Sequence, residues 1–195
     1  ARLLEAAVAM LAPGGKTAQL AAAGAEVIAV ELSDKRAVRL RANLERLRLD
    51  ARIEIADALA WRPPRPVGHL LLDAPCTATG TIRRHPDIAW HKSPDDVTRM
   101  AEIQARLLEA AVAMLAPGGV LVYASCSLQP EEGPLVIEQA LAGGLPLARL
   151  PVQSGELGGL AVDITPAGDV RTLPCHLAER GGLDGFFIAR LRRHD

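Results

Sequence analysis

Short apolar runs rich in β-branched residues alternate with amphipathic segments along most of the chain, and this alternation constrains the fold more than any other feature. The runs occupy residues 26–31, 52–56, 67–72 and 120–125. Their length and composition predict buried strands. Strands that alternate with helices are typical of an α/β fold with a mostly parallel sheet.

Three amphipathic segments between or after these runs are predicted to be helices. They cover residues 34–49, 94–115 and 130–141. Ser33 and Ser93 precede the first two and are suitable N-caps, and Pro94 suits the first turn of the second. The remaining tail is predicted to form short antiparallel strands, the last of them over residues 186–191.

A segment of fifteen residues, ARLLEAAVAMLAPGG, occurs twice without any difference, at 1–15 and at 105–119. Solenoid repeats drift in sequence and recur more than twice, so this is not a repeat architecture. A recent duplication, an artificial junction and a misassigned sequence are the alternatives. The identities of residues 1–11, which duplicate 105–115, are suspect for this reason.

Composition excludes several classes of protein. The length of 195 residues suits one domain, and no apolar run approaches the roughly 18–20 residues of a membrane span. Three Cys are too few for a disulfide framework, and they predict a reducing, cytoplasmic location. No metal-site pattern is present, and we expect a monomer. The net charge of -1 argues against a nucleic-acid partner, but it leaves room for local basic clusters.

Ligands of parallel α/β sheets bind at the carboxyl ends of the strands, so the residues at those ends are the candidate site. The first candidate is a glycine turn that leads into a helix. It consists of Ala12, Pro13, Gly14, Gly15 and Lys16. A P-loop needs glycine where Met10 stands, and no dinucleotide fingerprint is present. A turn of this kind brings backbone N–H groups close to a carboxylate or a ribose, although an ordinary turn is the alternative.

Acidic residues close the next two strands. Glu31 is placed to accept both hydroxyls of a ribose, and Asp57 to accept from an adenine amino group. A solvated strand end and a turn cap are the respective alternatives. Together with the glycine turn, they predict an adenosine site without a phosphate signature. S-adenosylmethionine fits such a site because it carries adenosine and an amino acid but no phosphate.

Two of the three cysteines follow predicted strands. Cys76 comes just after Asp73, and Cys126 follows the strand at 120–125. A buried structural cysteine is the ordinary alternative for each. Cys175 lacks this placement, and we interpret it as incidental.

The segments DAPCTATGTIRRHPDIAW and ASCSLQPEEG resemble the RNA cytosine-5 methyltransferases, within them the bacterial group that methylates 16S ribosomal RNA. APGGKTAQLAAAGA and GGLDGFFIARL are similar to the same group, so the resemblance covers residues 12–195. A Pro-Cys pair in one motif and a Ser-Cys pair in another form its most specific element. The resemblance implies a Rossmann-like, S-adenosylmethionine-dependent methyltransferase fold.

The resemblance also implies roles for individual residues. Cys126 would add to C6 of cytosine, which activates C5 toward the methyl group, and Cys76 would support the release of the enzyme. Asp73 would contact the base or the cofactor. The cofactor positions would be 12–16, Glu31, Asp57 and Asp73. No residue in the sequence is an evident base for the C5 proton.

A basic segment follows the first cysteine motif. Arg83, Arg84 and His85 could hold RNA phosphate or the extruded base, and a solvated basic loop is the alternative. Transfer RNA is the alternative substrate. A non-catalytic RNA-binding or assembly factor with this fold is a different class, and a nucleotide hydrolase is disfavoured by Met10.

Two features depart from this family. Its members have a strand before the glycine turn, where this chain has helix-like residues, and we expect a strand near residues 6–11 nonetheless. They also carry an N-terminal RNA-binding region. The chain is therefore expected to be a single catalytic domain over residues 1–195, and a fragment of a longer enzyme.

Overall fold

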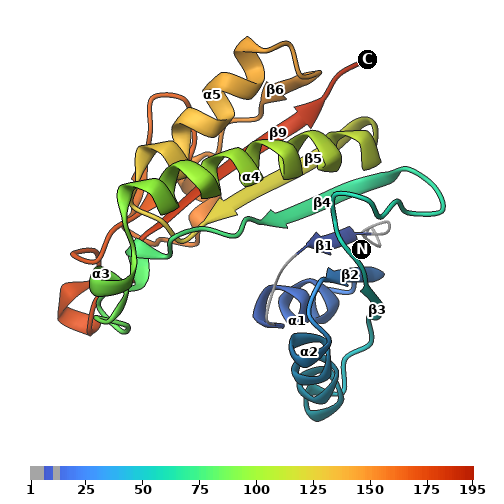
Figure 1. Ribbon diagram of the computed structural model, residues 1–195, viewed down its shortest axis with the longest axis horizontal. Helices are drawn as coiled ribbons and strands as arrows, with labels where there is room; N and C mark the ends of the chain where they lie inside the picture. The colour runs from blue at the N-terminus through green and yellow to red at the C-terminus, as the bar shows by residue number, and fades with distance from the viewer. Residues whose placement is uncertain (1–6, 11–13) are drawn as a thin grey trace.

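The strands of the molecule form one twisted sheet in the order β3-β2-β1-β4-β5-β9-β8-β7, with β6 beside β9 (Figure 1). The computed structural model describes the backbone of residues 7–10 and all of residues 14–195. Strands β1 to β5 pair in parallel, and the later strands pair antiparallel. The expected fold class is thus confirmed. The strands are Ala7–Met10 (β1), Val27–Glu31 (β2), Arg52–Ile55 (β3), Val67–Asp73 (β4), Leu115–Ser125 (β5), Leu147–Arg149 (β6), Asp163–Ile164 (β7), Val170–Thr172 (β8) and Phe186–Arg193 (β9).

Helices lie against this sheet, and α4 runs along β4 and β5 (Figure 1). The α-helices are Gly15–Ala22 (α1), Asp34–Leu47 (α2), Ile88–His91 (α3), Pro94–Met114 (α4) and Pro134–Ala142 (α5). The 3₁₀ turns are Thr79–Thr81 (η1), Pro130–Glu132 (η2), Ser154–Leu157 (η3) and Ala178–Arg180 (η4). Both expected N-caps are confirmed: Ser33 accepts from the N–H of Arg36, and Ser93 forms a capping box with Asp96.

The prediction of a helix over residues 130–141 was wrong at its start. Pro130–Glu132 forms the separate turn η2, and α5 begins at Pro134 after Gly133. A proline at the first position of α5 starts the helix, because proline lacks the N–H that a helix interior requires. The strand predicted at 120–125 begins earlier, at Leu115, because a bulge lets Leu115 pair with Val67.

The main core lies where α4, α5 and β9 pack on the central strands. Its fully buried large side chains include Leu70, Leu72, Leu121, Tyr123, Leu108, Met114, Ile137 and Leu191. A smaller cluster joins α1, β2 and α2 through Ala18, Ala29, Leu40 and Leu44. This packing fixes the carboxyl ends of β4 and β5, from which both cysteine loops start. No helix in the described part of the chain is long and apolar enough to cross a membrane.

The expected strand near residues 6–11 is present as β1. Ala7–Met10 pairs with β2 on one side and with β4 on the other, so it lies inside the sheet. The same four residues, AVAM, form the last turn of α4 at Ala111–Met114. Residues 1–6 and 11–13 lie outside the described part of the chain, and with them the positions Ala12 and Pro13.

Candidate active site

The two cysteines meet at the carboxyl edge of the parallel strands. Strands β4 and β5 pair with Asp73 opposite Ala124, so the loops that follow them leave the sheet side by side. Cys76 and Cys126 lie in these loops, both partly buried, with 3.3 Å between the two sulfur atoms. The sequence placed both thiols at this edge, and the structure brings them into hydrogen-bonding contact.

Backbone contacts hold the two loops together. The N–H of Gly80 donates to the carbonyl of Cys126 at 2.9 Å, and the N–H of Gly185 donates to the carbonyl of Gly80 at 2.7 Å. The N–H of Leu128 donates to the hydroxyl of Thr79 at 2.9 Å. The first loop is therefore packed between the second loop and the segment that precedes β9.

The contact between the sulfurs changes the acidity of both thiols. The hydrogen bond from Cys126, helped by the Ser125 hydroxyl, lowers the pKa of Cys76 to about 7 against the effect of burial. The same hydrogen bond, followed by burial, raises the pKa of Cys126. The pair therefore loses its first proton near neutral pH and retains the second, which gives one thiolate beside one thiol.

Asp73 ends β4 and forms an ion pair with Lys16 of α1. The ammonium Nζ lies 2.7 Å from a carboxylate oxygen of Asp73 and 5.1 Å from the ring centre of Phe186, which begins β9. Burial raises the pKa of Asp73, and the hydrogen bond from Lys16 opposes that shift. Lys16 and Asp73, both predicted site residues, are thus joined to each other beside the thiols.

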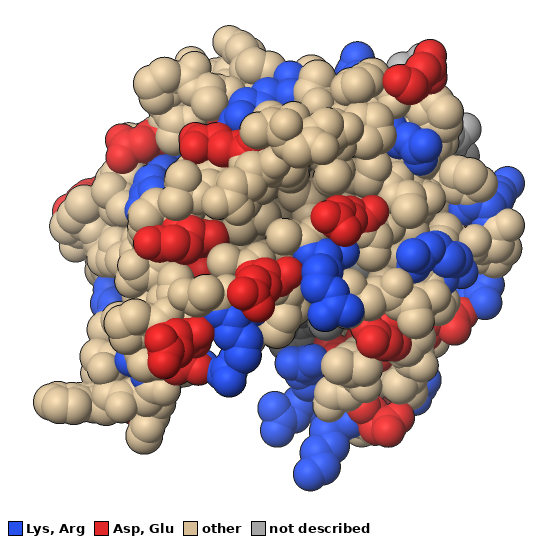
Figure 2. Space-filling view, turned by 45° about the horizontal axis from the view of Figure 1, so that its top comes forward, with Lys and Arg blue, Asp and Glu red and all other residues tan. Residues whose placement is uncertain are grey.

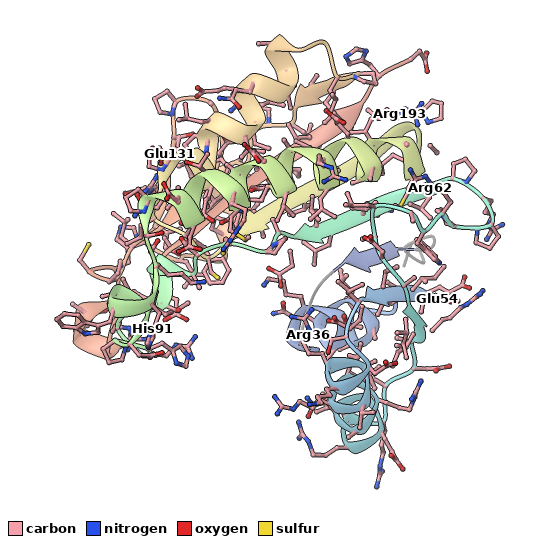
Figure 3. All side chains as sticks on the ribbon, viewed as in Figure 1. Arg36, Glu54, Arg62, His91, Glu131 and Arg193 are labelled. Atoms are coloured by element: carbon pink, nitrogen blue, oxygen red, sulfur yellow. The ribbon has the colours of Figure 1, made fainter. Side chains whose placement is uncertain are left out.

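Glu31 ends β2 and is almost completely buried, with 1% of its surface exposed. One carboxylate oxygen accepts from the N–H of Ser33 at 2.8 Å and from the guanidinium of Arg36. Its other oxygen is buried without a hydrogen-bond partner among the described residues, as is the hydroxyl of Thr17 in α1. Figure 3 shows Arg36 at the start of α2, on the side of the molecule that carries α1. Glu31 therefore offers, at the carboxyl end of β2, an acceptor that no described residue uses.

The other predicted cofactor positions differ in burial. Gly14 has φ +108°, a conformation that favours glycine, and no side chain caps the N-terminus of α1 that it and Gly15 open. Asp57 is exposed and accepts from the N–H of Leu59 at 2.9 Å. Asp57 thus stabilises its own turn, as in the alternative interpretation, and its position leaves it accessible to a ligand.

The basic residues after the first cysteine loop are held by an acidic residue that the sequence analysis did not single out. Arg84 donates to both carboxylate oxygens of Asp184, and Arg83 lies 3.5 Å from the same carboxylate. The hydrogen bond from Arg84 lowers the pKa of Asp184. His85 is exposed. Figure 2 shows acidic and basic side chains interspersed over one face of the molecule.

A second functional candidate that the sequence analysis missed is Glu132. It lies in the second cysteine motif, but the sequence pattern assigned it to a helix instead of a site. The structure buries it completely, and its carboxylate accepts from Thr77 and Ser127. Cys175 is exposed and unpaired among the described cysteines.

The sheet order, the glycine turn and the acidic end of β2 define the fold class of S-adenosylmethionine-dependent methyltransferases. The chain belongs to the family described as 16S rRNA methyltransferase RsmB/F, whose pattern it matches over residues 4–192. Two ribosomal RNA small subunit methyltransferases B, from Pseudomonas syringae and Pseudomonas putida, are 46% and 42% identical to it over 92% of the chain. The chain spans 40% of the length of each. The family predicted from the sequence is confirmed.

Solved structures agree with this assignment. NSun6 from Pyrococcus horikoshii with SFG has a TM-score of 0.82 and 28% identity, over 97% of this chain and 48% of its own. A methyltransferase homologue from the same organism has a TM-score of 0.71 and 33% identity, over 96% and 61%. The N-methyltransferase NodS from Bradyrhizobium japonicum, with S-adenosyl-L-homocysteine, shares the fold at a TM-score of 0.59 and 15% identity, over 98% and 78%.

Proposed function

We propose that the chain transfers a methyl group from S-adenosylmethionine to C5 of a cytosine in ribosomal RNA. The observation that carries this proposal is the pair of thiols 3.3 Å apart at the carboxyl edge of β4 and β5. The pair loses one proton near neutral pH, so it supplies one thiolate, and a thiolate is the form in which a cysteine acts as a nucleophile. Membership of an rRNA methyltransferase family supports ribosomal RNA as the substrate class. The free thiols suit a cytoplasmic, reducing location.

The residues at the edge fit the cofactor. The buried, unpartnered oxygen of Glu31 suits a ribose hydroxyl, and the uncapped N–H groups of α1 suit a carboxylate. In the strand order, β4, which ends at Asp73, lies between β2, which ends at Glu31, and β5, which precedes Cys126, and Lys16 is paired with Asp73. When bound, S-adenosylmethionine supplies an electrophilic methyl group. The chain supplies the nucleophile that makes C5 of cytosine reactive.

Cys126 is the attacking residue. In the resting pair the proton is on Cys126, so it first passes to the Cys76 thiolate across the 3.3 Å contact, and the sulfur of Cys126 then forms a bond to C6 of cytosine as a thiolate. Asp73, a carboxylate paired with Lys16, stabilises the protonated N3 edge of the base as charge shifts there. The electron pair of the C5–C6 double bond is thereby made available at C5, which is the atom that receives the methyl group.

Cys76 acts at the release of the product. After methylation the C5 proton leaves to water, the C5–C6 double bond re-forms, and the bond between C6 and the sulfur of Cys126 breaks. The thiol of Cys76 donates to the departing sulfur across the 3.3 Å contact. This stabilises the leaving thiolate and regenerates the starting pair with its single proton.

Replacing Glu31 with glutamine is expected to weaken the binding of S-adenosylmethionine by about 10- to 100-fold, the effect of losing hydrogen bonds to a charged acceptor. Isothermal titration calorimetry measures this affinity. Glu26→Gln is the matched control, because Glu26 is exposed and directly precedes the opposite end of the same strand. Equal affinity of the Glu31→Gln variant and the control would contradict the assigned ribose contact.

The test of the proposed function is bisulfite mapping of RNA methylated by the intact protein. The substrates are 16S ribosomal RNA and, separately, transfer RNA, each incubated with S-adenosylmethionine. New 5-methylcytosine in ribosomal RNA is the expected result. If only transfer RNA is methylated, the substrate is transfer RNA and the proposal of ribosomal RNA is wrong. Failure to bind the cofactor by calorimetry would favour the non-catalytic assembly factor instead.

A further inference from the structure

Glu132 is a carboxylate that is completely buried behind the two cysteine loops. One of its oxygens accepts from the N–H of Thr77 at 2.7 Å and faces the amide of Gln104 at 3.4 Å. Its other oxygen accepts from the hydroxyls of Thr77 and Ser127. No arginine or lysine in the described part of the chain forms an ion pair with it. Neutral donors therefore satisfy this buried charge, an arrangement that depends on all of them being in place.

The donors of Glu132 stand next to the two thiols. Thr77 directly follows Cys76 in the first loop, and Ser127 directly follows Cys126 in the second. The two loops start from different strands, and the carboxylate of Glu132 accepts hydrogen bonds from a residue in each loop.

The turn that carries Glu132 is itself fixed. The buried hydroxyl of Tyr123, in β5, donates to the backbone carbonyl of Glu132 at 2.9 Å. Gln104, in α4, donates to the carbonyl of Pro75, just before the first cysteine, at 2.8 Å. The turn of Glu132 is thus anchored to β5, and the start of the first cysteine loop is anchored to α4. From this fixed position the carboxylate can set the distance between the two cysteine loops.

We propose that Glu132 is a positioning residue, which joins the loops of Cys76 and Cys126 and so holds their sulfurs at hydrogen-bonding distance. It acts through Thr77 and Ser127 and touches no reacting atom. The expected effect on methyl transfer rests on the proposed function, whereas the expected effect on the contact between the thiols does not. The contact between the thiols exists in the protein without RNA, so its loss can be measured without substrate.

The negative charge of Glu132 has a separate effect, opposite in sign. The charge raises the pKa of Cys76, whereas the hydrogen bond from Cys126 lowers it and is the larger cause. The other charged groups that act on the pair are Asp73, Lys16 and Arg84. A variant that loses the sulfur contact therefore has a higher Cys76 pKa, and one that loses only the charge of Glu132 has a lower one.

Two variants separate position from charge. Glu132→Asp keeps the carboxylate but shortens it by one methylene, and Glu132→Gln keeps the length but loses an acceptor. In both, the midpoint of Cys76 alkylation by iodoacetamide is expected to rise from about 7 toward that of an ordinary thiol. Peptide mass spectrometry assigns the reaction to Cys76, in a Cys175→Ser background.

The matched control is Glu131→Gln, because Glu131 is the exposed neighbour in the same turn (Figure 3). It is expected to keep the alkylation midpoint of the parent. Methyl transfer by the two Glu132 variants should fall by about 10- to 100-fold in kcat with the KM for S-adenosylmethionine unchanged.

Three results would overturn the inference. They are an unchanged midpoint in both Glu132 variants, a midpoint that falls in Glu132→Gln alone, and a rise of equal size in the Glu131 control. If neither variant folds by circular dichroism, Thr77→Val and Ser127→Ala remove the donors one at a time, and unchanged midpoints in both would equally overturn it. Absence of methyl transfer in the parent protein would count against the proposed function and leave the alkylation result standing.

Discussion

Replacing Cys126 with alanine is expected to abolish methyl transfer, by about 10³-fold or more, because it removes the nucleophile. It should also abolish covalent capture of RNA that carries 5-fluorocytidine. Fluorine at C5 cannot leave as a proton does, so the adduct of the parent enzyme persists after methylation. Denaturing gel electrophoresis separates the protein–RNA adduct from free protein. A persistent adduct in the Cys126→Ala variant would contradict the assignment of Cys126 as the nucleophile.

Replacing Cys76 with alanine should have the opposite effect on the adduct. Without the thiol that donates to the departing sulfur, the bond to C6 breaks slowly, and the adduct accumulates even with unmodified RNA. Cys175→Ala is the matched control, because Cys175 is exposed and has no assigned role. It should behave as the parent does in both assays. If the adduct is lost in Cys76→Ala and retained in Cys126→Ala, the assignment is reversed: Cys76 is the nucleophile and Cys126 supports release.

The duplicated segment shows where local sequence stops determining structure. AVAM is a strand at Ala7–Met10 and a helix at Ala111–Met114, although the preceding six residues and the following five are also identical. Alanine and methionine favour the helix, so the strand depends on its partners, β2 and β4, which supply hydrogen bonds on both sides. The strand was predictable from the family pattern and not from its own residues.

The positions of the candidate site were predictable because strand ends are visible in the sequence. Asp73, Cys76 and Cys126 follow apolar runs, and parallel pairing brings such ends to one edge. The role of Glu132 could not be predicted from the sequence, because it depends on a hydrogen bond from Thr77, which is 55 positions away in the chain. An acidic residue at the start of an amphipathic segment also suits the first turn of a helix, and nothing local distinguishes the two.

The basic residues illustrate a similar limit. Arg83 and Arg84 form an evident pair in the sequence, but their carboxylate partner Asp184 is about 100 positions away. The pairing offsets part of their positive charge. It also holds the guanidinium of Arg84 in one orientation, which suits a group that recognises a phosphate in a defined place. Their role in RNA binding remains a prediction.

Replacing Gly80 with alanine is expected to be among the most destabilising single changes in the chain. A Cβ atom at this position would lie 2.1 Å from the carbonyl oxygen of Gly185 and 2.7 Å from that of Cys126. Both are backbone atoms that cannot turn away as a flexible side chain does. The segments must separate, at a cost of about 3 kcal/mol or more in the free energy of unfolding.

The same separation should remove the contact between the thiols, because the N–H of Gly80 donates to the carbonyl of Cys126 itself. Urea denaturation measures the loss of stability, and alkylation measures the Cys76 midpoint, which should rise from about 7. Gly155→Ala is the matched control, since no atom lies within 4 Å of a Cβ built there. It should change stability by less than about 0.5 kcal/mol. A Gly80→Ala protein with the stability and the thiol reactivity of this control would show that the two cysteine loops are not packed through Gly80.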